Sequence, residues 1–350
     1  MNTLNLETNE FLSDPLLLAR QAEHAVGYVG FDIPEDILAV PRLFAIHLPW
    51  RRDRATPFAD RWLEESFPGW ARSIVEEWAE GRFNFMESVV FTRGDDTSQR
   101  LYYYLCELQR HGSVAGPKPL IFDTARICRA SSEAWTVAAV RRLARELGLE
   151  DDDLAAGIDA ANRRREILAS IDANRGYRST YYERAARASL FAPAERLPRH
   201  STPAPVHTRR LLLAGSSPPD DSLHLAVEAA GWSVAGELYD RNLLRLGPVV
   251  PGADGDPCKR IARQAFRNRT GPRSFYDRPA TVLAEVERRQ ADAVVFWLYE
   301  EDEAIAWDVV DARTALEDNG VATLVMARRR WDLEDAPQAE IHRFLAGPGT

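Results

Sequence analysis

Short apolar runs alternate along this chain with longer amphipathic segments, and the two patterns predict different elements of secondary structure. Compact runs of β-branched and aliphatic residues between turn residues are typical of strands buried in a parallel sheet. Such runs lie at residues 26–31, 43–48, 88–91, 119–123, 210–215, 233–238, 293–298 and 321–326. Because amphipathic segments follow most of them, the pattern indicates βαβ units around parallel sheets.

The amphipathic segments predict helices, since their apolar residues recur at the three- and four-residue spacing of one helix face. We expect helices over residues 57–80, 95–108, 220–230, 257–267, 281–290 and 304–317. Between the fourth and fifth strands, residues 131–190 are helical in pattern throughout. This stretch predicts a helical connection between two groups of strands.

A proline-rich segment separates the two groups of strands. Three prolines lie within residues 197–205, where neither a helix nor a central strand can continue. The length of 350 residues also suits two domains, at about 100–200 residues each. The sequence therefore predicts an α/β protein with two Rossmann- or flavodoxin-like parallel-sheet domains. The N-terminal domain, with its helical extension, is expected over residues 1–200 and the C-terminal domain over residues 201–350.

Charge and cysteine content exclude several classes of protein. Lys and Arg number 44 against 53 Asp and Glu, and the net charge of −9 argues against a nucleic-acid partner. The three cysteines, Cys106, Cys128 and Cys258, are too far apart in the sequence for a zinc ribbon or a disulfide framework. No apolar run approaches the roughly 18 residues that a membrane span requires. The first residues lack the basic and apolar stretches of a targeting segment, so we expect a cytoplasmic protein without a membrane partner.

Candidate chemistry lies in four loops, because open parallel sheets bind ligands beyond the carboxyl ends of their strands. After the second strand, Trp50 and Arg51 are candidates for binding an anionic substrate, although exposed arginines are usually only solvated. After the third strand, Arg93 is a further candidate for substrate binding, beside Asp95 and Asp96. Paired carboxylates suit acid–base catalysis or cation binding, so both aspartates are candidate catalytic residues. Capping of the following helix explains the same two residues.

The third loop, after the first strand of the C-terminal half, contains Gly215, Ser216 and Ser217. Glycine permits close approach of a ligand, and the next helix presents free N–H groups, so we expect these residues to bind substrate. A plain tight turn is the simpler alternative, since neither a dinucleotide fingerprint nor a Walker lysine is present.

The fourth loop follows the strand at 293–298 and is acidic. Glu301 is a candidate catalytic residue, and Tyr299 and Glu300 are candidates for substrate binding. Capping of the next helix by one of these acids is again the simpler alternative. No residue is assigned as a metal ligand, because no histidine pair or cysteine cluster has metal-ligand spacing.

A series of segments, taken in order along the chain, has the pattern of a known family. They are Gly27–Leu38 with Pro34-Glu35, Ser88–Phe91 followed by Asp96–Tyr102, the helix at Asn162–Arg165, Leu211–Pro218, Gly271–Arg273, Asp292–Val295 and Gly320–Leu324. In their order and spacing these segments resemble the 2-hydroxyacyl-CoA dehydratase and benzoyl-CoA reductase family, which contains the D-component of 2-hydroxyglutaryl-CoA dehydratase. The similarity covers roughly residues 20–335.

The resemblance implies a two-subunit enzyme whose subunits are similar and which binds an acyl-CoA. Members of the family carry a [4Fe–4S] cluster on cysteines at strand ends, receive one electron from an ATP-driven activator, and use radical chemistry. In this chain the three ligand positions would fall beside Phe67-Pro68, at Asp95 and near Glu301, and none is cysteine. Because such a cluster requires thiolates, we do not expect the cluster or its radical dehydration here.

Three functions remain open. The leading hypothesis is a cluster-less accessory subunit, paired with a paralogous subunit or a second copy, or a binding protein for an acyl-CoA-like small molecule. The alternative is an enzyme with changed, non-radical chemistry, in which Asp95, Asp96, Glu300 and Glu301 act as acid and base or bind a divalent metal in a cleft between the domains. The third is a purely structural interaction protein.

Overall fold

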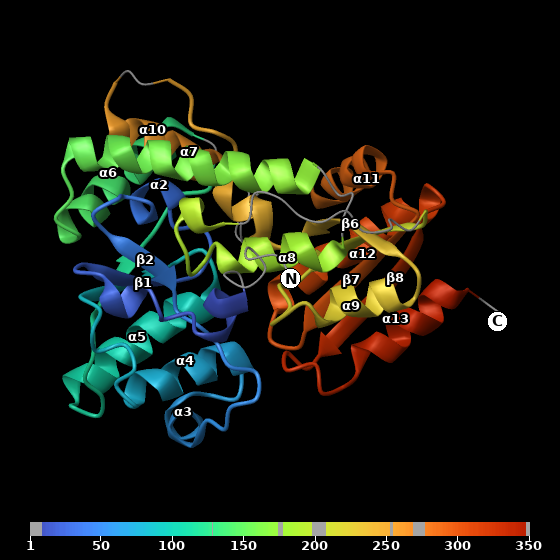
Figure 1. Cartoon of the computed structure of the whole chain (residues 1–350), viewed down its shortest axis with the longest axis horizontal. Helices are drawn as coiled ribbons and strands as arrows, with labels where there is room; N and C mark the ends of the chain where they lie inside the picture. The colour runs from blue at the N-terminus through green and yellow to red at the C-terminus, as the bar shows by residue number, and fades with distance from the viewer. Residues whose placement is uncertain are drawn as a thin grey trace. The chain divides into compact units, whose positions relative to one another are not determined.

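The protein is represented by a computed structural model, which describes residues 9–127, 129–173, 178–197, 208–252, 255–268 and 277–347 (Figure 1). The chain divides into two compact units. The first comprises residues 1–168, 187–198 and 243–275, and the second comprises residues 169–186, 199–242 and 276–350. Most of the predicted linker, at 198–205, lies outside the described residues, and the predicted domain boundary near residue 200 stays a prediction.

Each unit contains one four-stranded sheet in which every strand is parallel to its neighbours. The first sheet has the order β2 (Phe44–His47), β1 (Ala25–Val29), β3 (Ser88–Thr92) and β4 (Lys118–Phe122). The second has the order β6 (Ser233–Leu238), β5 (Arg210–Gly215), β7 (Ala293–Tyr299) and β8 (Ala322–Arg329). The predicted fold class, with two parallel-sheet domains, is confirmed, and so are all eight predicted strands.

Helices cover both faces of the first sheet (Figure 1). On one face, α4 (Gly69–Ala79) and α5 (Asp96–Arg110) pack against inward side chains such as Val89 and Phe91. On the other face, Val90 and its neighbours pack against α6 (Ala130–Glu146), α7 (Asp151–Ala173) and α10 (Pro257–Arg267). Successive strand residues point to opposite faces, so the continuous apolar runs in the sequence reflect burial on both sides.

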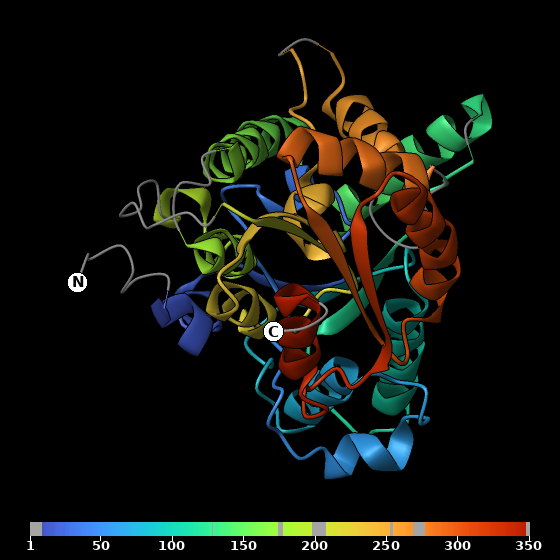
Figure 2. The same ribbon diagram turned by 90° about the vertical axis from the view of Figure 1, so that its right-hand side faces the viewer.

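The second sheet is covered in the same way. On one face, Phe296 and Leu298 pack against α11 (Arg278–Arg289) and α12 (Glu303–Asp318). Two further helices, α9 (Ser222–Ala229) and α13 (Pro337–Ala346), contact this sheet and each other (Figure 2). The other elements are α2 (Glu35–Leu38), α8 (Ser179–Ala188) and the short turns η1 (Ala19–Gln21), η2 (Ala194–Arg196) and η3 (Asp240–Leu244).

The prediction of one continuous helix over residues 57–80 is wrong. The segment contains two helices, α3 (Pro57–Trp62) and α4, and Leu63 between them is extended. Pro68 lies immediately before α4, where its fixed φ and missing N–H suit a helix start but not a helix interior. The helices α2 and α13 were not predicted, because each is short or flanked by residues in non-helical conformations.

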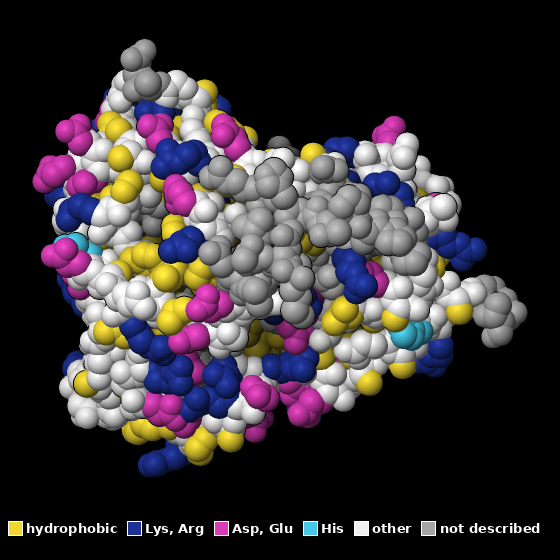
Figure 3. Space-filling model, viewed as in Figure 1, with side chains coloured by type: hydrophobic (Ala, Val, Ile, Leu, Met, Phe, Trp, Pro, Cys, Tyr) yellow, Lys and Arg dark blue, Asp and Glu magenta, His cyan; other side chains and the backbone are white. Residues whose placement is uncertain are grey.

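The surface of the first unit carries charges of both signs, interspersed over the face visible in Figure 3. Within the described ranges, none of the helices combines the length and the apolar character needed to cross a membrane. The expected absence of a nucleic-acid partner and the expected cytoplasmic location stay predictions.

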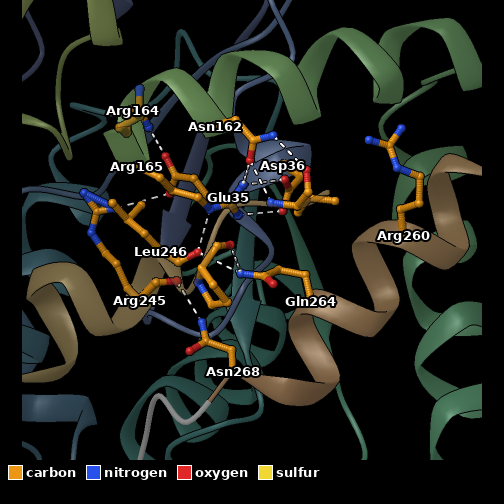
Figure 4. A network of polar contacts seen from close by, with 12 residues as sticks. Glu35, Asp36, Asn162, Arg164, Arg165, Arg245, Leu246, Arg260, Gln264 and Asn268 are labelled. Carbon is orange, nitrogen blue, oxygen red and sulfur yellow. Dashed lines mark hydrogen bonds and ion pairs between the residues drawn. The ribbon is translucent and has the colours of Figure 1, made fainter. Parts of the chain in front are cut away.

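A buried ionic network connects four segments of the first unit (Figure 4). Glu35 and Asp36 open α2, and both are buried. Arg165 of α7 donates from Nη1 and Nη2 to the two carboxylate oxygens of Asp36, each at 2.9 Å. Arg164, the next residue on α7, pairs with Oε1 of Glu35, and Arg245 lies 3.2 Å from Oε2. Each buried carboxylate therefore has a guanidinium partner.

The network continues into the segment between η3 and α10. The Nε of Arg165 donates to the carbonyl of Leu246 at 2.8 Å. The side chain of Asn162 exchanges two hydrogen bonds of 3.0 Å with the backbone of Val250. On α10, Gln264 donates to the carbonyl of Pro248 at 2.7 Å. This segment therefore packs with the first unit, although it is distant from α2 in the sequence.

The charges in the network also set the ionisation of Glu35. Burial alone would raise the pKa of its carboxyl, but Arg164 and Arg245 outweigh burial and hold this pKa below the ordinary value. Glu35 therefore stabilises the fold at neutral pH, and that contribution is lost as the pH falls through the lowered pKa.

Replacement of Arg165 by Met tests the network, because it leaves the Asp36 carboxylate buried without its bidentate partner. We expect the free energy of unfolding in urea to fall by about 3–5 kcal/mol. Arg42→Met is the matched control, since the Arg42–Asp153 pair is 3.1 Å long but the Arg42 side chain is 41% exposed. Its loss should change stability by at most about 1 kcal/mol. Equal effects of the two substitutions would contradict the structural importance of the network.

Candidate functional sites at the strand ends

The order of strands places a topological switch point in each sheet. In the first sheet the chain order reverses between β1 and β3, and in the second it reverses between β5 and β7. Ligands of open α/β sheets bind beyond the carboxyl ends of the strands at such points. Three of the four predicted loops follow β3, β5 and β7, and the fourth follows the neighbouring strand β2.

In the first unit, the loop between β3 and α5 contains Arg93, Asp95 and Asp96. Asp95 is the N-cap of α5, and its Oδ1 accepts a hydrogen bond of 2.7 Å from the backbone N–H of Ser98. The side chain of Asp96 is 74% exposed and lies 3.5 Å from Arg100. Arg93 lies 3.0 Å from Asp123. The geometry thus gives Asp95 a helix-capping role, while catalysis by either aspartate stays a prediction.

A buried acid at this switch point was not among the predicted residues. Asp32 follows β1, accepts a hydrogen bond from the hydroxyl of Thr92, and pairs with Nη2 of Arg126 at 2.8 Å. Burial raises the pKa of its carboxyl, and Arg126 opposes that rise. A β-carbon at Gly94 would collide with the Asp32 carboxylate, which explains the glycine in this loop. The strand-end rule was a sufficient signal for Asp32, because the residue directly follows the central strand.

The residues after β2 are held by packing. Trp50 is half-buried, and its ring stands edge-on to His47 at 5.4 Å between centroids and tilted to Phe191 at 6.1 Å. Arg51 is exposed, with its Nε 3.9 Å from Asp53, and its backbone N–H donates to Ser73 Oγ at 3.1 Å. The guanidinium of Arg51 therefore faces solvent, and substrate binding by these two residues stays a prediction.

In the second unit, Gly215, Ser216 and Ser217 form a tight turn at the end of β5. Gly215 has φ of 103°, and a β-carbon there would collide with the carbonyl of Trp297 on the adjacent strand. The backbone N–H of Ser216 donates to that carbonyl at 2.9 Å. Ser217 Oγ accepts a hydrogen bond of 3.3 Å from the backbone N–H of Arg241. Glycine is thus required by the close approach of β5 and β7.

The side chains of the acidic loop after β7 differ in their exposure to solvent and in their contacts. The ring of Tyr299 lies 6.0 Å from that of Trp297, and Glu300 is exposed, with its N–H bonded to the carbonyl of Arg329 at 2.9 Å. Glu301 is half-buried. Asp302 occupies the N-cap position of α12, but its side chain makes no capping hydrogen bond to that helix. Sequence reasoning did not distinguish Asp302 from the two glutamates before it.

The Asp302 carboxylate instead contacts the β5 turn, where its Oδ2 accepts a hydrogen bond of 2.6 Å from Ser216 Oγ. Burial raises the pKa of Asp302 to about 6, and the charges of Asp240 and Glu301 act in the same direction. The Ser216 hydroxyl and Arg278 oppose the rise. Asp302 therefore changes charge near neutral pH. Neither its residue type nor its neighbours in the sequence could predict this raised pKa, because it arises mainly from burial in the folded chain.

A buried ion pair anchors the β5 turn to the chain after β6. Arg241 donates from Nη2 to Glu183 of α8 at 2.7 Å, and from Nη1 to the carbonyl of Pro218. Both side chains are buried, so each charge is compensated by the other. The turns after β5 and β6 are thereby held together at the carboxyl edge of the second sheet.

The residues at the implied cluster positions do not fit an iron–sulfur cluster. Phe67 is buried, with the guanidinium carbon of Arg100 4.1 Å from its ring centroid, and Asp95 caps α5. Burial raises the pKa of the Cys106 and Cys258 thiols, which disfavours the thiolate that a cluster needs, and Cys128 lies outside the described residues. Among the described residues, no group of three or more His, Cys, Asp or Glu side chains is placed to hold a metal ion.

Comparison with known proteins gives one match. The family model for 2-hydroxyglutaryl-CoA dehydratase, D-component, matches residues 31–341, a range that includes strands of both sheets. No curated protein matches the chain.

Replacement of Asp95 by Ala removes the side-chain cap of α5, so we expect a loss of about 1 kcal/mol in the free energy of unfolding in urea. Asp95→Asn is the matched control, because asparagine lacks the charge but can cap a helix equally well. If Asn destabilised the protein as much as Ala, the charge of Asp95 rather than its capping hydrogen bond would be the important property.

Replacement of Asp302 by Asn tests its raised pKa. Because the folded-state pKa of about 6 lies above the ordinary 3.8, the protonated carboxyl favours the folded state below about pH 4, and this advantage is lost as the pH rises through 6. At pH 7.5 we expect Asp302→Asn to be more stable than the wild type by about 1–2 kcal/mol in urea unfolding, with the difference shrinking towards pH 4.5. Asp311→Asn, at an exposed position of α12, serves as the control. A difference independent of pH would contradict the raised pKa.

Proposed function

The chain belongs to the 2-hydroxyglutaryl-CoA dehydratase, D-component family, and from that membership we propose that it is a cluster-less accessory subunit that binds an acyl-CoA-type ligand. One observation carries this proposal. The positions at which the resemblance implies cysteine ligands hold Phe67-Pro68, Asp95 and Glu301, and two of these positions serve the fold, through the buried ring of Phe67 and the cap of α5.

In the proposed role the chain keeps the fold of the family but not the cluster on which its redox chemistry depends. Phe67 packs against the guanidinium of Arg100, and Asp95 caps α5. Both side chains therefore have structural roles, which argues against a cluster-binding role for either position. Thiolates are the protein ligands of [4Fe–4S] clusters, and carboxylates do not replace a set of three. In the proposed role, electron transfer and radical chemistry belong to another subunit.

Ligand binding is proposed for the strand-end loops. Both switch points retain polar side chains held by hydrogen bonds, such as Asp32 with Arg126 and Ser216 with Asp302. Such preformed polar groups at the carboxyl ends of parallel strands are typical of ligand sites. The residues assigned to the ligand are Trp50, Arg51, Arg93, Gly215, Ser216, Ser217, Tyr299 and Glu300.

The proposed partner is a paralogous, cluster-bearing subunit, in keeping with a family whose D-components work with other subunits; a second copy of this chain is the other candidate. This choice follows from the missing cysteines, because a subunit without the cluster needs a partner that has one for the family's reaction to occur.

Acid–base chemistry without a cluster is a second candidate function, and one observation favours it. Asp302 has a pKa near 6 and a hydrogen bond to Ser216 at the switch point of the second sheet, so it could exchange a proton near neutral pH. In this version Asp302 is a more suitable acid or base than Asp95, whose carboxylate is bonded to the backbone of α5.

Purification under anaerobic conditions, followed by iron analysis, visible absorption and calorimetric titration with acetyl-CoA, tests the proposal. We expect less than one iron per chain, no broad visible band, and saturable binding of acetyl-CoA. Stoichiometric iron with a visible band would overturn the cluster-less assignment. Absence of acetyl-CoA binding, both to the chain alone and after co-expression with a cluster-bearing paralogue, would overturn the ligand assignment.

A further inference from the structure

Asn242, in the turn after β6, is buried although its side chain has no hydrogen-bond partner within the described part of the chain. The residue is 1% exposed, and neither Oδ1 nor Nδ2 is bonded. Only its backbone is held, through an N–H that donates to the carbonyl of Tyr239 at 3.3 Å. A carboxamide has two donors and two acceptor sites, and leaving all of them unsatisfied in the interior is costly. Such a group needs an explanation.

Asn242 lies at the carboxyl edge of the second sheet. β6 pairs with β5 up to Leu238 and Ala214, so the chain after β6 emerges beside the β5 turn. The residue before Asn242 donates its backbone N–H to Ser217 Oγ at 3.3 Å. On the other side of the same turn, Ser216 donates to Asp302 at 2.6 Å. Three strand ends thus bring polar groups to one edge.

A second polar group at this edge is also buried without a partner among the described residues. Trp297 is fully buried, and its Nε1–H has no acceptor. Its backbone is in register with Gly215, the first residue of the β5 turn. The unpaired carboxamide thus follows β6 and the unpaired donor lies in β7, the two strands that flank β5 in the sheet.

Asn162 shows how this chain satisfies an asparagine with a structural role. Both polar atoms of its side chain bond the backbone of Val250, at 3.0 Å each. Asn242 makes neither kind of bond. The contrast favours a partner for Asn242 that is not part of the chain.

We propose that Asn242 recognises a secondary amide of the ligand, with Nδ2–H donating to its carbonyl and Oδ1 accepting from its N–H. A neutral amide fits because the buried cation at this edge, Arg241, already pairs with Glu183 at 2.7 Å. The identification of the ligand rests on the proposed function: the pantetheine arm of coenzyme A carries two secondary amides.

Asn242→Leu tests the assignment, because leucine has a similar volume but no hydrogen-bonding groups. Without ligand, Asn242→Leu should melt at a higher temperature than the wild type, whereas the control Asn162→Leu should melt at a lower one. Binding of acetyl-CoA and of reduced pantetheine, measured by calorimetry, should weaken about tenfold in Asn242→Leu and remain unchanged in Asn162→Leu. If leucine prevents folding at residue 242, Asn242→Ala provides the same binding comparison.

Two results would overturn the inference: a melting temperature lowered by Asn242→Leu as much as by Asn162→Leu, or unchanged affinity for both probes. Wild-type binding of acetyl-CoA that is insensitive to residue 242 would leave the proposed function standing without this contact. Wild-type binding of pantetheine but not of acetyl-CoA, lost in Asn242→Leu, would support the amide contact and reject the acyl-CoA assignment. Failure to bind either probe would reject both.

Discussion

Compensation of buried charge is the constraint on which the first unit depends. Glu35 and Asp36 open a helix of only four residues that cannot be stable alone, and both carboxylates are removed from water. They are accommodated because α7 presents Arg164 and Arg165 side by side, and because Arg245 arrives from a distant part of the chain. The backbone carbonyls and amides of residues 246–250 bond to side chains of α7 and α10. This explains why residues 243–275 pack with the first unit although they follow strands of the second.

The elements that could be predicted are those determined by local patterning. Eight apolar runs became eight strands, since a strand buried on both faces must be apolar throughout. The error at residues 57–80 arose because helical spacing of aromatic residues outweighed Pro68, whose effect on the backbone is stronger than any periodicity. For the sites, the strand-end rule selected loops that follow β2, β3, β5 and β7, and it would also have selected Asp32. It could not distinguish Asp302 from Glu300 and Glu301, because only tertiary packing decides which acid turns inward.

In the proposed function, the strand ends keep polar side chains in place without the family's redox chemistry. Asp95 occupies a position where the family resemblance implies a cysteine, and there it accepts the backbone N–H of Ser98, in the first turn of α5. In the proposed function, a helix cap stands where the family resemblance implies a metal ligand, and that cap stabilises the fold. In the second unit, Ser216 is buried and bonds the half-buried Asp302, while Asn242 is buried with no partner for its side chain among the described residues. Folding alone would disfavour a buried polar group that has no partner. These residues are the main reason to assign a ligand to a chain that lacks the cluster cysteines.

Hydrogen exchange of the backbone amides, with and without acetyl-CoA, tests this account most directly. Residues 216–217 and 239–242 lie in the turns after β5 and β6, and ligand binding at the second switch point should slow the exchange of their amides. The account predicts protection in these two segments, with the amides of the Glu35 network unchanged. No change in either segment at a saturating concentration of acetyl-CoA would contradict it.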